Sequence, residues 1–134
     1  MQIILNRVVL AAALIFMPAT LAQAAQKPLK APGVTVRPGT VSGIHDLYAW
    51  DGRCRPVAVG FKVLKAENGR LYTVPATYRI KGATGDACNG RMVSGKKIVF
   101  QPKAGFKGST LVRYSVTAPK IKNTYVISRP ISVR

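Results

Sequence analysis

Apolar and polar residues alternate along most of the chain after its first two dozen residues, as they do in half-buried β-strands. Every second position in the strongest of these runs is apolar, and polar, small or proline residues stand between. One run breaks its alternation at Arg129, just before Pro130, where a bulge or an edge position would explain the change. The pattern predicts strong strands at 57–63, 72–80, 112–116 and 125–133, and weaker ones at 34–36, 44–50 and between 92 and 100.

Glycine and proline separate these runs. The 110 residues after position 24 contain 12 Gly and 8 Pro, and no stretch free of both exceeds ten residues. An average helix needs about 11 residues, and its interior tolerates proline poorly. Turns are expected at Pro38-Gly39, Asn68-Gly69, Asn89-Gly90 and Gly105–Gly108. We therefore predict one all-β domain, a Greek-key β-sandwich of about seven short strands.

The first 24 residues have a different pattern. Arg7 is followed by an uninterrupted apolar run at 8–17, then by Pro18 and by the small-x-small sequence at 22–24. This order is typical of a secretory signal peptide, and ten apolar residues are too few to cross a bilayer core, which takes about 20 in a helix. We expect a periplasmic or secreted protein that is not transmembrane, with a signal peptide at 1–24, an extended leader at 25–32 and the domain at 33–134.

The composition is strongly basic. After position 24 the chain carries 20 Lys or Arg and 4 acidic residues, a net charge of +16. Such a charge attracts anionic partners, including lipopolysaccharide, acidic polysaccharide and membrane surfaces. Export argues against a specific nucleic-acid partner. The other interpretation, which the sequence leaves open, is that the charge only keeps an exported protein soluble.

Cys54 and Cys88 are the two cysteines of the chain. In an oxidising compartment two thiols of a small domain usually pair, and closing this loop would stabilise the fold by roughly 3–4 kcal/mol on the loop-entropy estimate. The spacing lacks the close cysteine pairs of a zinc site. We predict a structural disulfide, and a reactive or intermolecular thiol is the alternative.

This disulfide would bring basic loops together. Arg53 and Arg55 flank Cys54, and three more basic residues follow Cys88. The Cα atoms of bonded cysteines lie roughly 5.5–6 Å apart, and binding sites often lie on loops. We predict a cationic, polyanion-binding cluster at one end of the sandwich, and scattered charge on solvated loops is the alternative. The cluster comprises Arg53, Arg55, Arg91, Lys96 and Lys97.

Residues 98–117, IVFQPKAGFKGSTLVRYSVT, contain a recognisable motif. It runs aromatic, any residue, Pro, a short spacer, Gly-aromatic-x-Gly and an alternating strand ending in Tyr-x-Val. The motif resembles the closing strands of bacterial immunoglobulin-like and cadherin-like domains of exported proteins, and Val63–Leu71 resembles that family's Asn-Gly hairpin. The resemblance covers about residues 54–118 and implies an immunoglobulin-like fold while saying almost nothing about function. Its motif positions are Phe100, Pro102, Gly105, Phe106, Gly108, Tyr114 and Val116.

The chain departs from this family at positions where many relatives place aspartates that are common in calcium or turn contacts. Thr110 and Thr117-Ala118 stand there instead. A hard-cation site needs several oxygen ligands, often carboxylates, and the whole chain has four acids. We expect no metal site and no cofactor.

Catalytic chemistry has one candidate, His45, with Ser42 and Asp46 nearby. Adjacent strand residues point to opposite faces, triad partners normally come from separate elements, and no Gly-x-Ser-x-Gly sequence is present. We favour a non-catalytic, monomeric interaction or structural module of the cell envelope. Its expected partner is an anionic glycan, lipopolysaccharide or an envelope protein. A small secreted hydrolase using His45 is the alternative.

Three aromatic residues, Tyr48, Trp50 and Phe106, could stack on sugars. A tryptophan buried beside a disulfide is the commoner arrangement in immunoglobulin-like sandwiches. We therefore assign Trp50 to the core.

Overall fold

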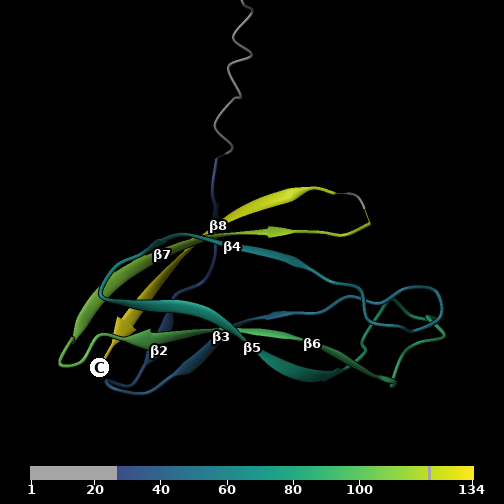
Figure 1. The fold of residues 1–134 in the computed structure, drawn as a ribbon, viewed down its shortest axis with the longest axis horizontal. Helices are drawn as coiled ribbons and strands as arrows, with labels where there is room; N and C mark the ends of the chain where they lie inside the picture. The colour runs from purple at the N-terminus through teal and green to yellow at the C-terminus, as the bar shows by residue number, and fades with distance from the viewer. Residues whose placement is uncertain (1–26, 121) are drawn as a thin grey trace, which may run out of the picture.

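The computed structural model describes residues 27–120 and 122–134, so the predicted signal peptide lies outside the described residues. Within them the chain forms eight β-strands and no helix (Figure 1), and therefore no helix that could span a membrane. The strands are β1 Leu29–Lys30, β2 Val34–Val36, β3 Ser42–Leu47, β4 Gly60–Ala66, β5 Gly69–Arg79, β6 Met92–Pro102, β7 Gly108–Thr117 and β8 Thr124–Val133.

The strands form two sheets that pack as layers. One sheet has five strands in the order β1-β8-β7-β4, with β2 also paired to β8, and the other has three in the order β3-β6-β5. The pairs β1–β8 and β2–β8 are parallel, and all other pairs are antiparallel. The facing orders β3-β6-β5 and β8-β7-β4 follow the immunoglobulin arrangement. The predicted all-β sandwich is confirmed.

Several strand boundaries differ from the predicted ones. The strand expected from residue 57 begins at Gly60, because Val57 instead donates its backbone N–H to the carbonyl of Ala49, outside any sheet. The Asn68-Gly69 turn does not close a hairpin, since β4 pairs with β7 and β5 pairs with β6. Asn68 adopts a φ of 61° as the chain crosses between the sheets. Part of the predicted leader forms β1 beside β8.

The main core lies between the two sheets. Phe100 and Ile98 of β6 face Tyr114 and Val112 of β7, and all four are fully buried. Two of the three motif aromatics, Phe100 and Tyr114, therefore sit at the centre of the fold. Gly69 belongs to this packing, because a Cβ there would collide with the ring of Phe100.

A second, smaller cluster lies on the outer face of the three-stranded sheet. Paired residues of neighbouring strands point to the same side, so Tyr78 of β5 and Val93 of β6 share a face opposite to that of the core residue Ile98. We call it the disulfide cluster, and it consists of Ile80, Cys88 and Val93, with Tyr48, Trp50, Cys54 and Tyr78 packed against them.

Trp50 lies beside the disulfide, as expected, but it is outside the main core. Trp50 is half-buried and belongs to the disulfide cluster. The reason is that β3 ends at Leu47, so Trp50 lies beyond the strand and packs with the disulfide at the end of the sheet rather than between the sheets.

Candidate functional site

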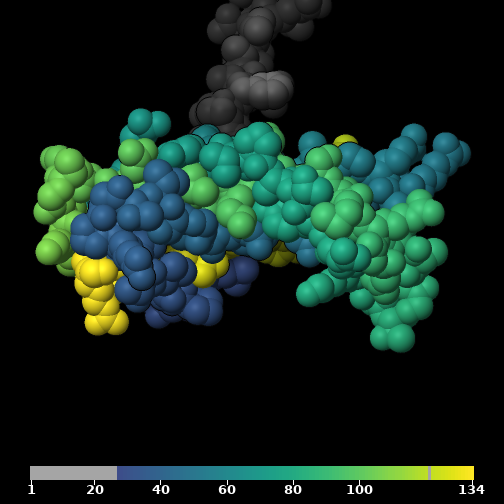
Figure 2. All heavy atoms as spheres, turned by 90° about the horizontal axis from the view of Figure 1, so that it is seen from below, coloured from purple at the N-terminus to yellow at the C-terminus, as the bar shows by residue number. Residues whose placement is uncertain are grey.

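The predicted disulfide is present. Cys54 and Cys88 are bonded with their Cα atoms 5.3 Å apart, and they join the β3–β4 connection to the β5–β6 connection. Figures 1 and 2 show these two segments gathered at one end of the elongated molecule. The bond therefore closes that end of the sandwich.

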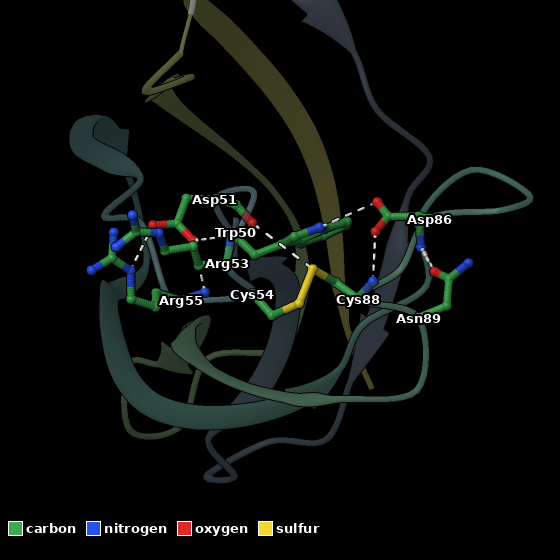
Figure 3. The surroundings of a disulfide bond; sticks show 9 residues. Trp50, Asp51, Arg53, Cys54, Arg55, Asp86, Cys88 and Asn89 are labelled. Atoms are coloured by element: carbon green, nitrogen blue, oxygen red, sulfur yellow. Dashed lines mark hydrogen bonds and ion pairs between the residues drawn. A yellow bond between two sulfur atoms is a disulfide. The ribbon is translucent and has the colours of Figure 1, made fainter.

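A single carboxylate organises the loop around Cys54. Asp51 accepts hydrogen bonds from the backbone N–H groups of Arg53 and Arg55, each at 2.9 Å, and from Nε of Arg55 at 2.9 Å (Figure 3). These bonds support the positive φ of 61° at Cys54 between the two arginines. The backbone donor of Arg55, more than any other cause, holds the pKa of Asp51 below its usual value. Asp51 is therefore ionised and fixed in a loop-forming role.

A second carboxylate organises the other loop. Asp86 accepts the backbone N–H of Cys88 at 2.8 Å and the indole N–H of Trp50 at 3.3 Å. Asn89 accepts the N–H of Gly82 and donates to the carbonyl of Ala83. Asp86 thus connects the two disulfide-linked segments a second time, through Trp50 (Figure 3).

Three aromatic rings extend from the disulfide end onto the outer face of the three-stranded sheet. Tyr48 stacks on Tyr78 with centroids 4.5 Å apart and lies 6.1 Å from Trp50. The stack requires glycine at residue 95, because a Cβ added there would lie 2.7 Å from Cβ of Tyr48. Tyr78 donates its hydroxyl to Asp46 at 2.8 Å, and burial, followed by this bond and the Asp46 charge, raises the pKa of Tyr78 to about 12.

Two of the three residues considered for sugar stacking share one place. Tyr48 and Trp50 line an open hollow of about 370 Å³ whose other wall is Ala118–Lys120. Phe106 instead packs against the main core. The structure therefore does not bring the three aromatics into one platform.

The predicted cationic cluster is only partly assembled. Arg53 and Arg55 lie together on the side of the disulfide away from Asp86 (Figure 3). Arg91 is held nearby, because its backbone N–H bonds the carbonyl of Cys88 at 3.1 Å. The Arg55 guanidinium is already paired with Asp51, which leaves Arg53 and Arg91 without a carboxylate partner in the described part of the chain.

Lys96 and Lys97, which were expected in the same cluster, point away from each other. Both lie in the middle of β6 rather than in a turn, and consecutive strand residues point to opposite faces. Lys97 lies on the outer face, 3.8 Å from Asp46. Lys96 lines a hollow of about 270 Å³ with Leu47 and residues 56–59.

The side chain of His45 points into the interior of the sandwich, where it contacts a tyrosine and no nucleophile. Its Nδ1 lies 2.8 Å from the hydroxyl of fully buried Tyr114, which also accepts Nε of Arg129 at 3.4 Å. Burial first, and then the Arg129 charge, hold the pKa of His45 below its usual value, while Asp46 opposes them. Ser42 makes no hydrogen bond to His45 within the described residues, and Asp46 binds Tyr78 instead. The triad considered from the sequence is not assembled.

Every acidic residue of the chain is engaged. Asp51 and Asp86 anchor the two loops, Asp46 binds Tyr78 and Lys97, and Glu67 pairs with Lys65 at 3.4 Å. By contrast, only three of the 20 described basic residues, which are all but Arg7, lie in ion pairs. Sequence counting reveals the excess of positive charge but not that each carboxylate is occupied.

No metal-binding group emerges from these side chains. Within residues 27–120 and 122–134, no three His, Cys, Asp or Glu residues lie close enough together to hold an ion.

No protein-family model matches this chain, and no curated protein matches it. Among solved structures, the solution structure of amebosin is similar at 13% identity, covering 81% of this chain and 100% of that chain with a TM-score of 0.41. A likeness this distant identifies no family and indicates no function.

Proposed function

We propose that this protein is an exported, non-catalytic immunoglobulin-like module that binds anionic polymers of the cell envelope. The observation that carries the proposal is the state of the four carboxylates, each of which anchors a loop, a tyrosine or a lysine. No free carboxylate offsets the remaining basic residues of the described chain. The uncompensated charge is therefore available to phosphate or carboxylate groups of a partner.

The charge also has a physical cost that solubility alone does not require. Acidic residues maintain solubility at least as well as basic ones, and a one-sided charge repels itself within the folded state. A chain that retains acids only in structural positions fits selection for a cationic surface. Arg53 and Arg91 add guanidinium groups, whose planar donors match phosphate and carboxylate oxygens.

Retention on immobilised anionic polymers tests the function. The purified protein is applied to lipopolysaccharide and to polygalacturonate, with neutral dextran as control, at about 50 and about 500 mM salt. We expect retention on both anionic polymers at low salt and its loss at high salt, because screening acts within about 8 Å at physiological ionic strength and at shorter range above it. Retention unchanged by salt, or equal on dextran, would contradict the proposal.

A pair of matched double variants tests the contribution of the disulfide end. Arg53→Ala/Arg91→Ala and Lys120→Ala/Lys122→Ala remove the same charge, the second from the β7–β8 turn. A defined site at the disulfide predicts a larger loss of binding for the arginine variant. Equal losses would show that only net charge acts there.

A further inference from the structure

A row of basic residues crosses the outer face of the five-stranded sheet. Lys30 of β1 is in register with Ser128 of β8, Ser128 with Arg113 of β7, and Arg113 with Lys65 of β4. Residues in register point to the same side. The neighbours of Arg113 along β7, which include Tyr114, are buried between the sheets, so the row faces outward.

A further lysine and serine lie on the same face, in the adjacent row. Lys62 of β4 is in register with Ser115 of β7, two positions along the strand from Arg113, and the register shift between Val63 and Lys65 places Lys65 on the same face as Lys62. Neighbouring strands are about 4.8 Å apart, so Lys65 lies about 5 Å from Arg113 and Lys30 about 10 Å from it. The four cations form a strip across the sheet, which we call the basic strip: Lys30, Lys62, Lys65 and Arg113.

The basic strip is electrostatically unfavourable in the isolated protein. Like charges directly opposite each other on paired strands destabilise a sheet, and Lys65 stands opposite Arg113. Glu67 contacts Lys65 at 3.4 Å but makes no ion pair with Arg113 in the described chain.

Arg113 is also incompletely satisfied. Its Nε is buried and has no hydrogen-bond partner among the described residues. A buried donor without a partner in a native structure requires an explanation. An anion drawn to the guanidinium would offset the opposed charges of Arg113 and Lys65.

The surroundings of the strip indicate the chemistry of its ligand. Ser115 and Ser128 place hydroxyl groups between the cations, where they can exchange hydrogen bonds with sugar hydroxyls. Binding of single-stranded nucleic acid relies on aromatic side chains that stack on bases. The tyrosines of β5 and β7 point to other faces, since Tyr72 and Tyr78 belong to the other sheet and Tyr114 to the core.

We propose that the basic strip binds a linear acidic polysaccharide, with Arg113 and Lys65 holding one carboxylate-bearing sugar and Lys62 and Lys30 its neighbours. This inference rests on the proposed function, because it assigns a face and a ligand class to the general binding of anionic polymers. It is distinct from the disulfide end, where Arg53 and Arg91 lie.

Matched charge removal tests the strip. Lys65→Gln/Arg113→Gln is compared with Lys103→Gln/Lys107→Gln, which removes the same charge from the β6–β7 turn, in calorimetric titrations with soluble polygalacturonate at about 50 mM salt. We expect about tenfold weaker binding for the first variant and at most about threefold for the second, because charge-assisted hydrogen bonds are lost only in the first. Replacing Arg113 by Lys instead of Gln should preserve part of the affinity, because lysine keeps the charge.

A measurement on the unaltered protein covers the case in which the variant does not fold. The Nε–H NMR signal of Arg113 should shift on titration with polygalacturonate and stay unchanged with neutral dextran. Equal losses in the two double variants, or no shift of this signal, would overturn the strip while leaving the proposed function standing. Binding of a single-stranded oligonucleotide in preference to polygalacturonate would overturn the ligand class. Failure of the unaltered protein to bind any anionic polymer would instead contradict the proposed function itself.

Discussion

The main core and the disulfide cluster stabilise the two parts of this molecule by different means. The main core contains ten buried residues drawn from both sheets, whereas the disulfide cluster has three, Ile80, Cys88 and Val93. A small apolar cluster gains little from burial, so its loops depend on the covalent bond and on Asp51 and Asp86. The sheets are therefore stabilised by apolar burial, while the end of the sandwich is fixed by specific polar and covalent contacts.

Truncating the centre of the main core should give the largest effect. Phe100→Ala removes a fully buried ring that packs between the sheets. We expect a loss of about 3–5 kcal/mol in the free energy of unfolding, the usual range for phenylalanine truncation, measured by urea denaturation. A loss below about 1 kcal/mol would show that burial between the sheets is not the dominant contribution.

Removing the disulfide should have the next largest effect. Cys54→Ala/Cys88→Ala opens a loop whose ends are 34 positions apart, and we expect a loss of about 3–4 kcal/mol from the greater freedom of the unfolded chain. Hydrogen exchange gives the regional readout. Amides of β6 and β7 beside the main core should stay the best protected, and those of residues 80–91 should lose most protection.

The bond itself has a direct check. Intact mass of the unreduced protein after treatment with an alkylating reagent should show no added label. Two labelled thiols without prior reduction would contradict the disulfide and with it the contrast between the two regions.

The main core could be predicted from the sequence because its pattern is local. Phe100 and Tyr114 belong to an alternating motif, and alternation shows directly which side of a strand is buried. The partners of each strand could not be predicted in the same way. Asn68-Gly69 has the sequence of a hairpin turn, yet the chain crosses there to the other sheet, since pairing is set by the packing of distant strands.

At the disulfide end, the covalent bond could be predicted from the sequence, but the polar contacts around it could not. The pairing of Cys54 with Cys88 followed from composition, but the roles of the carboxylates depend on contacts between separate loops, such as that of Asp86 with Trp50. Lys96 and Lys97 were expected in a turn-rich stretch, but β6 continues through both of them. The basic strip requires the register of four strands, which the sequence does not contain.

Adding a methyl group at Gly95, beneath the aromatic stack, should lower stability by less than the two changes above, and its effect should be confined to the disulfide cluster. A Cβ at residue 95 would lie 2.5 Å from the carbonyl oxygen of Leu47 and 2.7 Å from Cβ of Tyr48. We expect Gly95→Ala to lower the free energy of unfolding by about 1–3 kcal/mol through overpacking, with a change in the fluorescence of Trp50, the single tryptophan of the chain. Gly52→Ala, with open space around its Cβ, is the matched control. Equal effects of the two substitutions would contradict the role of Gly95.

The smallest expected effect is the dependence of stability on pH, which should differ between the main core, where His45 lies, and the disulfide end, where Asp51 lies. The hydroxyl of Tyr114 accepts a hydrogen bond from Nε–H of Arg129 and lies 2.8 Å from Nδ1 of His45, so both basic side chains meet at one buried oxygen. Burial and Arg129 lower the pKa of His45 in the folded protein. The unfolded chain therefore takes up a proton first as pH falls below about 6.5, and stability should decrease from about pH 7 until the folded pKa is passed.

The pKa of Asp51 is lowered as well. For a carboxylate, a lowered pKa stabilises the folded protein, and this stabilisation is lost only at acidic pH. Its contribution is present above the unfolded pKa of 3.8 and is lost only as pH falls through the lower folded value. Urea denaturation at pH 7, 5 and 3 should therefore show a first decrease that His45→Asn removes and a later one that Asp51→Asn removes. His45→Asn keeps an acceptor for Tyr114 without a proton to gain, so an unchanged decrease between pH 7 and 5 in that variant would exclude His45 as its source.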